Sequence, residues 1–331
     1  MKRFLLIFIL STSSLFGLRN FQRFYIGAEN IGIGNAAVAD SSAESTIVYN
    51  PSIIPALYST NSSFIISYEV FSTFKIIDIL ALNIKYDFDI FPFFSFILPK
   101  ENYGLSLSLE DLFYSPEASF DLRFVKLSLS YKPLENFVIG FSPGFLIATE
   151  NNGYGFGYGG QFSFLLKILE NLEMGGSFLY FSQVEWDITP YGDKLIEKFP
   201  NEINFGGTLK MNKDLFFYFS IANSFLNEVS FTIDGTKTTP EWATNFIYLK
   251  PSIGVRFLEK NTGGHIAIGC FIDHYFTETS ILNQYYLTFG FRGYGKRLKY
   301  NISFTDGYLI NLFYRENIPR ESINISFSFY F

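Results

Sequence analysis

The sequence has few of the residues that build covalent, metal-bound or catalytic centres. It contains one cysteine, Cys270, and two histidines, so an internal disulfide and a multi-cysteine metal site are excluded. We interpret Cys270 as a small buried residue on a strand. His265 and His274 are separated by an odd number of positions on one expected strand, which places them on opposite faces and excludes a shared metal. No Gly-x-Ser-x-Gly motif is present, and we predict neither enzyme activity nor a cofactor.

Charged residues are also scarce, at 17% of the chain, and the net charge is −6. The Lys and Arg residues are scattered singly, whereas a phosphate-binding surface needs clustered cations. Nucleic acid is therefore excluded as a partner. In contrast, aromatic residues make up 20% of the chain, with 42 Phe and 22 Tyr, more than in an average soluble domain.

Long apolar runs are missing after the N-terminus. Lys2 and Arg3 precede an apolar run from Phe4 to Leu10, and a small residue follows at Gly17. This order is typical of a secretory signal peptide, so we predict a cleaved signal over residues 1–17. No cysteine lies near that site, which excludes a lipoprotein signal. An exported chain without a later spanning helix has two destinations, the periplasm or the outer membrane.

Two-residue alternation decides between these destinations. Val125, Leu127, Leu129 and Tyr131 alternate with Lys126, Ser128, Ser130 and Lys132, and the same period recurs over 202–211, 284–292 and 321–331. Many such segments have the length that a tilted strand needs to cross a bilayer. The polar positions carry Ser, Asn, Thr and Gly where a soluble surface would carry more Lys and Glu. The pattern therefore predicts an all-β fold, a transmembrane antiparallel β-barrel of about 14 strands over residues 61–331.

The connections between these segments differ in length. Short ones rich in Gly, Pro, Asn and Asp, such as 132–136, 212–214 and 293–296, predict tight turns. The longer stretches Asp187–Asn201 and Asp234–Asn245 are expected to be extracellular loops. Gly155-Phe-Gly-Tyr-Gly-Gly160 has the spacing of a dinucleotide-binding loop, but a strand pattern follows it, so we interpret it as a glycine-rich strand start.

The segment 24–57 has a different composition. Small residues that include Gly27, Gly32 and Gly34 allow close backbone packing, and Asp40 ends this part. Asn50 before Pro51 predicts the N-cap and first turn of a short helix.

This segment resembles the N-terminal signature of the FadL-type outer-membrane transporters and their PorV/PorQ relatives. In that group a Gly- and Ala-rich stretch leads through an acidic stretch to an aromatic-Asn-Pro-Ala-Gly-Leu motif. Residues 39–44, Ala-Asp-Ser-Ser-Ala-Glu, correspond to the acidic stretch. Tyr49-Asn50-Pro51 corresponds to the second motif, from which Ser52 and Ile53 depart.

The resemblance implies a barrel whose N-terminal residues, 18–60, form a plug or hatch in the lumen, with Gly27, Gly32, Gly34, Asp40, Tyr49, Asn50 and Pro51 as its motif. It also implies passage of hydrophobic small molecules, such as long-chain fatty acids or aromatic hydrocarbons, across the outer membrane. The alternative is a PorV/PorQ-like barrel that binds and hands on secreted proteins in a type IX-like pathway. An outer-membrane lipase or protease is a third, remote alternative.

Three residues carry further expectations. Pro92 and Pro143 interrupt strand-like runs and each removes a ladder donor; in the resembled transporters an interrupted strand opens the wall sideways, so one of them is expected beside a lateral opening. The terminal Phe331 looks like the signal read by the barrel-assembly machinery. The expected partners are thus outer-membrane lipid, this machinery and a hydrophobic cargo.

Overall fold

The computed structural model of the chain describes residues 22–23, 26–58, 62–72, 86–88, 93–115, 120–150, 153–186, 194–240, 243, 248–258, 264–276, 281–307 and 321–331. The predicted signal peptide and Pro92 lie outside the described residues. Among the residues described, no helix is long and apolar enough to cross a membrane.

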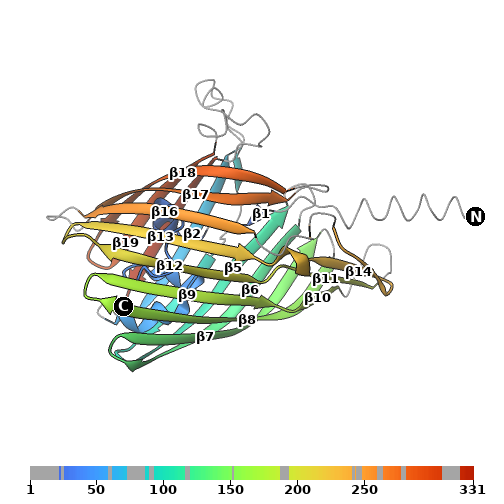
Figure 1. The fold of residues 1–331 in the computed structure, drawn as a ribbon, viewed down its shortest axis with the longest axis horizontal. Helices are drawn as coiled ribbons and strands as arrows, with labels where there is room; N and C mark the ends of the chain where they lie inside the picture. Colours follow the sequence, from blue (N-terminus) through green and yellow to red (C-terminus); the bar gives the residue numbers. More distant parts are fainter. Residues whose placement is uncertain are drawn as a thin grey trace, which may run out of the picture.

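Fourteen strands in the described residues form one closed antiparallel barrel (Figure 1). In order around the wall they are β2 (Ser63–Ser72), β4 (Phe93–Pro99), β5 (Tyr103–Ser115), β6 (Phe120–Leu134), β7 (Phe137–Glu150), β8 (Gly153–Leu169), β9 (Leu172–Phe181), β12 (Glu202–Lys210), β13 (Leu215–Ser224), β16 (Leu249–Leu258), β17 (His265–Phe276), β18 (Ile281–Tyr294), β19 (Leu298–Asp306) and β20 (Glu321–Tyr330). β20 pairs back onto β2, from Ser63 opposite Tyr330 to Ser72 opposite Glu321. The predicted fold class and strand number are confirmed.

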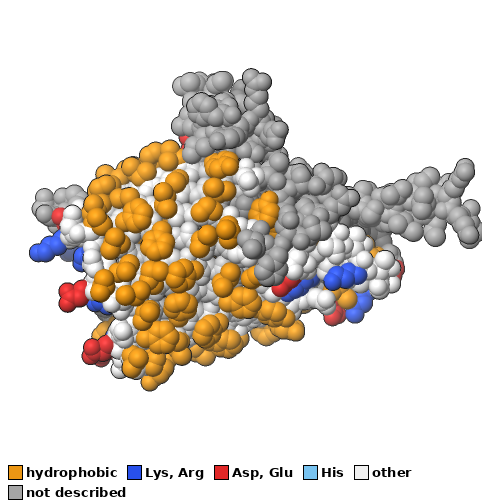
Figure 2. Space-filling view, viewed as in Figure 1, with side chains coloured by type: hydrophobic (Ala, Val, Ile, Leu, Met, Phe, Trp, Pro, Cys, Tyr) orange, Lys and Arg blue, Asp and Glu red, His pale blue; other side chains and the backbone are white. Residues whose placement is uncertain are grey.

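The alternating pattern places apolar side chains outside and polar ones inside. On β6, Leu127, Leu129 and Tyr131 are exposed, whereas Lys126 and Ser128 are buried. Figure 2 shows apolar side chains over the visible wall, with charged side chains gathered at its two ends. Closure pairs both edges of each barrel strand, and this arrangement fits a lipid environment because no backbone edge is left in hydrocarbon.

The two ends of the barrel differ. Short turns at 100–102, 135–136, 170–171, 211–214 and 295–297 lie at the end where β20 finishes, and the long connections 182–201 and 225–248 lie at the opposite end. Figure 1 shows β10, β11 and β14 at this long-loop end, away from the C-terminus.

The long connections are partly ordered into short strands, and two of these lie within the stretches that were expected to be extracellular loops. β9 continues after Ser182 as β10 (Gln183–Trp186), and both pair with β8. β11 (Leu195–Lys198) pairs with β10 and with β14 (Ser230–Ile233), which forms a hairpin with β15 (Thr236–Thr238). The short helix η3 (Leu226–Glu228) precedes β14. These strands extend one side of the wall beyond the barrel.

The N-terminal segment, which we define as residues 26–58, lies inside the barrel. It contains α2 (Ala28–Gly32), η1 (Glu44–Val48) and η2 (Pro51–Leu57), all built mainly of buried residues. α2 packs against β17–β20, and η2 packs against β4–β8. The segment therefore bridges opposite walls of the lumen. Upstream of it, β1 (Gln22–Arg23) pairs with β5.

Candidate functional site

The barrel interior changes character along its length, as the inward face of β6 shows. Phe120, Leu122 and Phe124 point inward near the long-loop end, and Lys126 and Ser128 point inward further along. The interior therefore has an apolar part at the long-loop end and a polar part that holds the N-terminal segment. Sequence alternation alone could not show this division, because the inward residues of both parts occupy equivalent positions.

The apolar part is a cluster of buried side chains that we call the apolar compartment. Phe199 stacks between Phe113 and Phe120, with ring centroids 6.0 and 5.9 Å apart, and Phe124 meets Phe181 edge to face at 6.0 Å. Its other members are Leu112, Leu122, Leu146, Ala148, Leu179, Val184, Trp186, Leu195 and Leu226. Such packing offers an apolar molecule the same surroundings as a protein core.

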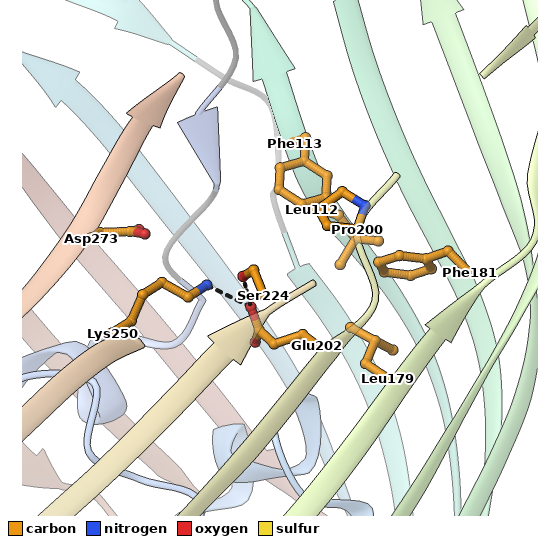
Figure 3. A pocket seen from close by; sticks show the side chains of 9 residues that line it. All are labelled: Leu112, Phe113, Leu179, Phe181, Pro200, Glu202, Ser224, Lys250 and Asp273. Atoms are coloured by element: carbon orange, nitrogen blue, oxygen red, sulfur yellow. Dashed lines mark hydrogen bonds and ion pairs between the residues drawn. The ribbon is translucent and has the colours of Figure 1, made fainter. Parts of the chain in front are cut away.

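A polar border separates this compartment from the N-terminal segment (Figure 3). Lys250 and Glu202 form an ion pair at 2.5 Å, and the Ser224 hydroxyl donates to the same Glu202 oxygen at 3.2 Å. The cavity at the border is lined by Leu112, Phe113, Leu179, Phe181, Pro200, Glu202, Ser224, Lys250 and Asp273 and has about 10 Å³ of free space. That space holds about one water molecule, so any larger guest has to displace side chains.

Asn50 fixes one half of the N-terminal segment to the wall. Its Nδ2 donates to the carbonyls of Val38 at 2.6 Å and Phe164 at 2.9 Å, while its Oδ1 accepts from the Ser52 amide at 3.1 Å. Pro51 takes the first position of η2, where a missing amide hydrogen costs nothing. The predicted helix start at Asn50-Pro51 is confirmed, and the helix is of the 3-10 type.

Lys126 completes this side of the site. Its side chain is fully buried, pairs with Glu110 at 2.7 Å and donates to the carbonyl of Val48 at 3.2 Å, near the end of η1. Gln161 supports it by accepting from Lys126 at 2.8 Å and donating to the carbonyl of Tyr49 at 2.8 Å. A cation near the free carbonyls of a helix end is favourable, so Lys126 binds the segment through its backbone.

The small residues of the segment allow its backbone to touch the wall. Gly34 has a φ of +68°, and an added Cβ there would lie 2.4 Å from the carbonyl oxygen of Ile253. Gly32 faces Gly290 so closely that a Cβ would lie 2.8 Å from the Gly290 Cα. Gly27, with a φ of +84°, packs on Ser45 of the same segment. Three of the motif residues thus stand where a side chain does not fit.

Acidic residues of the segment pair with basic residues of the facing wall. Asp40 binds Arg256 of β16 at 2.6 Å, and Glu29 binds Lys299 of β19 at 3.2 Å. Tyr49 is buried and its hydroxyl donates to the carbonyl of Ile26 at 3.5 Å. The structure therefore brings Gly27, Gly32, Gly34, Asp40, Tyr49, Asn50 and Pro51 together inside the lumen.

The remaining predicted residues lie elsewhere. Pro143 is on β7 with its ring exposed on the outside. The register of the β6–β7 pairing is the same on both sides of Pro143. Leu127 and Ser128, the β6 residues opposite Pro143 and Ser142, are not paired with β7. Phe331 follows β20, is exposed, and donates its amide to the carbonyl of Ser62 at 3.0 Å.

No protein-family model and no curated protein sequence matches the chain. Among solved structures, it is similar to the CymD monoaromatic hydrocarbon channel, with a TM-score of 0.66, 11% identity and coverage of 92% of this chain and 97% of that one. It is also similar to the toluene transporter TbuX of Ralstonia pickettii (0.64, 12%, 92% and 98%) and to a FadL homologue of Pseudomonas aeruginosa (0.63, 8%, 93% and 99%). The chain has the fold of these proteins.

This shared fold agrees with the FadL-type resemblance of the N-terminal motif, while the PorV/PorQ branch stays a prediction. Sequence reasoning missed the cations that meet the segment, Lys126, Arg256, Arg292 and Lys299. One signal was available for three of them, since Lys126, Arg256 and Lys299 each occupy an inward position between two apolar residues, as Lys126 does between Val125 and Leu127. Within the described part of the chain, no group of three or more His, Cys, Asp or Glu could hold a metal ion.

Proposed function

We propose that the protein is an outer-membrane channel for small hydrophobic molecules and that the N-terminal segment is its movable plug. The observation that carries this proposal is the apolar compartment, which lies inside the barrel at the long-loop end and ends at the plugged polar part. Transfer of an apolar solute from water into such a compartment is favourable. A path past the plug then leads to the short-turn end of the barrel. The proposal includes export through a cleaved signal peptide and assembly in the outer membrane.

Two features of the chain support this arrangement. On the face that Figure 2 shows, apolar side chains cover much of the outer wall and charged side chains lie at its ends, as expected of a wall in lipid. The cavity at the border has room for only about one water molecule, so a larger cargo passes this point only if side chains move. The plug fills the lumen beyond the border, and we infer that it moves when cargo passes.

The class of cargo follows from the lining. Phe113, Phe120, Phe124, Phe181 and Phe199 present ring faces and edges to the compartment, and ring pairs of this kind bind a further aromatic ring favourably. The similar structures include a monoaromatic hydrocarbon channel and toluene transporters. We therefore place aromatic hydrocarbons before long-chain fatty acids as cargo.

Uptake of radiolabelled toluene by bacteria that produce the protein tests this function. We expect faster initial uptake than in cells without it. Phe181→Gln, which adds a polar group to the compartment, should lower that rate, and Tyr180→Gln, on the outer face of the same strand, should leave it unchanged. Equal uptake with and without the protein contradicts the proposal. If deletion of the protein then impairs release of secreted proteins, the PorV/PorQ-like function is the better account.

We further propose a lateral exit near the predicted proline interruptions. Among the described residues, β5 pairs with β4 from Gly104 to Glu110. Beyond a shift in its pairing with β6 at Asp111–Phe113, β5 pairs with β1. The short strand β3 (Tyr86–Phe88) pairs with β2 in a register that differs from that of β4. The change of partner along β5, from β4 to β1, supports an opening at the start of β4, to which Pro92 is adjacent in the sequence. The two missing rungs of the β6–β7 ladder support one beside Pro143.

A further inference from the structure

Two small cavities adjoin the polar border, and the same three charged residues, Glu202, Lys250 and Asp273, line both of them. The first is the border cavity described above, which opens on phenylalanine and leucine side chains of the apolar compartment (Figure 3). The second is lined mainly by polar side chains and has about 20 Å³ of free space; we call it the polar cavity. Space of this size fits one water molecule or one hydroxyl group. The border therefore joins an aromatic-lined cavity to a polar one of hydroxyl size.

Two amide side chains of the polar cavity have an oxygen that accepts no hydrogen bond. One is Asn204 of β12, which is 8% exposed and faces the lumen, since its neighbours Ile203 and Phe205 are exposed on the outer face. The other is Asn35 of the N-terminal segment. Oδ1 of each is buried and has no partner. A buried acceptor without a donor is costly, so the cavity favours a ligand that brings a hydrogen-bond donor.

Other polar side chains of the polar cavity are paired with one another. The hydroxyls of Ser220 and Ser252 share a hydrogen bond of 2.8 Å, and Lys250 pairs with Glu202 at 2.5 Å. Among the described residues that line the polar cavity, the two amide oxygens are thus the buried acceptors without a donor. A ligand can bind them without breaking the pairs beside them.

The charges of the border determine which kind of donor fits. Glu202 and Asp273 place two carboxylates beside the polar cavity, so they repel an anionic head group. Lys250 places an ammonium there and repels a second cation, and an ion of either sign would also lose its hydration. A neutral hydroxyl avoids these penalties. It can donate to Oδ1 of Asn204 and accept from a nearby donor such as Lys250.

We propose that the polar cavity binds the hydroxyl group of a phenolic cargo whose ring lies in the apolar compartment. Phe113 and Phe181 line the border cavity, and a ring held against them directs its hydroxyl past the shared charged residues to Asn204. Asn35 of the plug is part of this site, so the cargo binds while the plug is in place. The inference rests on the proposed function, because the ring takes the path proposed for apolar cargo. It extends the cargo from aromatic hydrocarbons to hydroxylated ones.

Binding of toluene, p-cresol and p-toluate to the purified protein tests the site. These probes share a methyl-substituted ring and carry hydrogen, hydroxyl or carboxylate opposite the methyl group. Calorimetric titration of the protein in lipid nanodiscs, corrected with empty nanodiscs, measures each affinity. We expect p-cresol to bind about tenfold more tightly than toluene, as for one hydrogen bond to a buried acceptor. We expect p-toluate to bind more weakly than p-cresol, because the border carboxylates repel it.

Two variants remove the acceptors one at a time. Asn204→Leu keeps a side chain of similar size, and Asn35→Gly suits the φ of +60° at that position. Each should bind p-cresol more weakly, by about tenfold for Asn204→Leu, and should bind toluene as the wild type does. Asn324→Leu is the matched control, since Asn324 of β20 is buried and also has an unpartnered Oδ1 but does not line the polar cavity. It should leave both affinities unchanged.

The outcomes separate the hydroxyl site from the channel function. Folding of each variant is checked by the heat-dependent shift of the barrel on gels. Equal affinities of the wild type for p-cresol and toluene overturn the hydroxyl site and leave the channel function intact. The same holds if p-toluate binds most tightly, or if Asn204→Leu and Asn324→Leu weaken p-cresol binding equally. Absence of toluene and p-cresol binding to the wild type, beyond that of empty nanodiscs, overturns the proposed function itself.

Discussion

Asn50 and Phe164 are joined by a hydrogen bond of 2.9 Å from the side chain of the plug residue to a main-chain carbonyl of β8. The two residues are 114 positions apart in the sequence. The same amide nitrogen also donates to Val38, so one side chain links two parts of the plug to the wall. The η2 half of the plug is therefore anchored on the β8 side of the lumen.

Replacing Asn50 with Ala should loosen this anchor. It removes hydrogen bonds to buried carbonyls, and leaving such groups unsatisfied costs about 1–3 kcal/mol each. We expect residues 26–58 to become accessible to protease in the folded protein, while the barrel itself persists. Asn136→Ala, in an exposed turn, is the control. Equal protection of the plug in Asn50→Ala and in the control would contradict the anchor.

A larger residue at Gly254 should push the plug from the opposite wall. An added Cβ there would lie 2.2 Å from the carbonyl oxygen of Ile33, whereas at Gly295 the nearest atom would be 3.5 Å away. Gly254→Val should therefore raise ion conductance in planar bilayers above the wild-type level, and Gly295→Ala should not. A closed Gly254→Val barrel with a displaced plug would show that something else seals the lumen.

A charged side chain placed on the outward face should destabilise the barrel, and more strongly the deeper it lies in the membrane. Leu107 lies in the middle of β5 and Tyr103 at its start, both exposed on the outer face. Leu107→Arg should make folding into phospholipid vesicles less favourable by about 2–4 kcal/mol, and Tyr103→Arg should make it less favourable by about 0–1 kcal/mol. Denaturant titration of the reconstituted protein measures both. Equal small effects would mean that this face does not contact lipid.

The proposed lateral exit predicts different effects for the two prolines. Valine at position 92 or 143 restores a backbone donor and favours continuous pairing, so the variant beside the opening should take up toluene more slowly than the wild type. The other variant then serves as its control. Wild-type rates in both variants would exclude an exit at either interruption.

Much of the fold followed from local pattern, because the two-residue period of β6 or β20 directly reports an apolar outside and a polar inside. The strand count and the helix start at Asn50-Pro51 rest on the same kind of short-range signal. The β14–β15 hairpin was missed although its turn carries Asp234-Gly235, with both φ values positive, a favoured pair for tight hairpins.

The contacts of the plug could not be predicted in the same way. Asp40 and Arg256 are 216 positions apart, and no local period links two residues that meet only after the barrel closes around the segment. The apolar compartment could not be predicted either. Phe124 and Lys126 both occupy inward positions of β6, and they differ only in how far along the lumen they lie.

A reversible tether between plug and wall tests the central claim most directly. The Ala28 amide donates to the Ser326 hydroxyl at 2.8 Å, so Ala28→Cys with Ser326→Cys places two thiols at this contact, with Cys270→Ser removing the native thiol. If the plug must move, cells that carry the oxidised protein should take up toluene no faster than cells without the protein, and reduction of the disulfide should restore uptake. Uptake that is equal in the oxidised and reduced protein, with the disulfide verified by mass spectrometry, would contradict a movable plug.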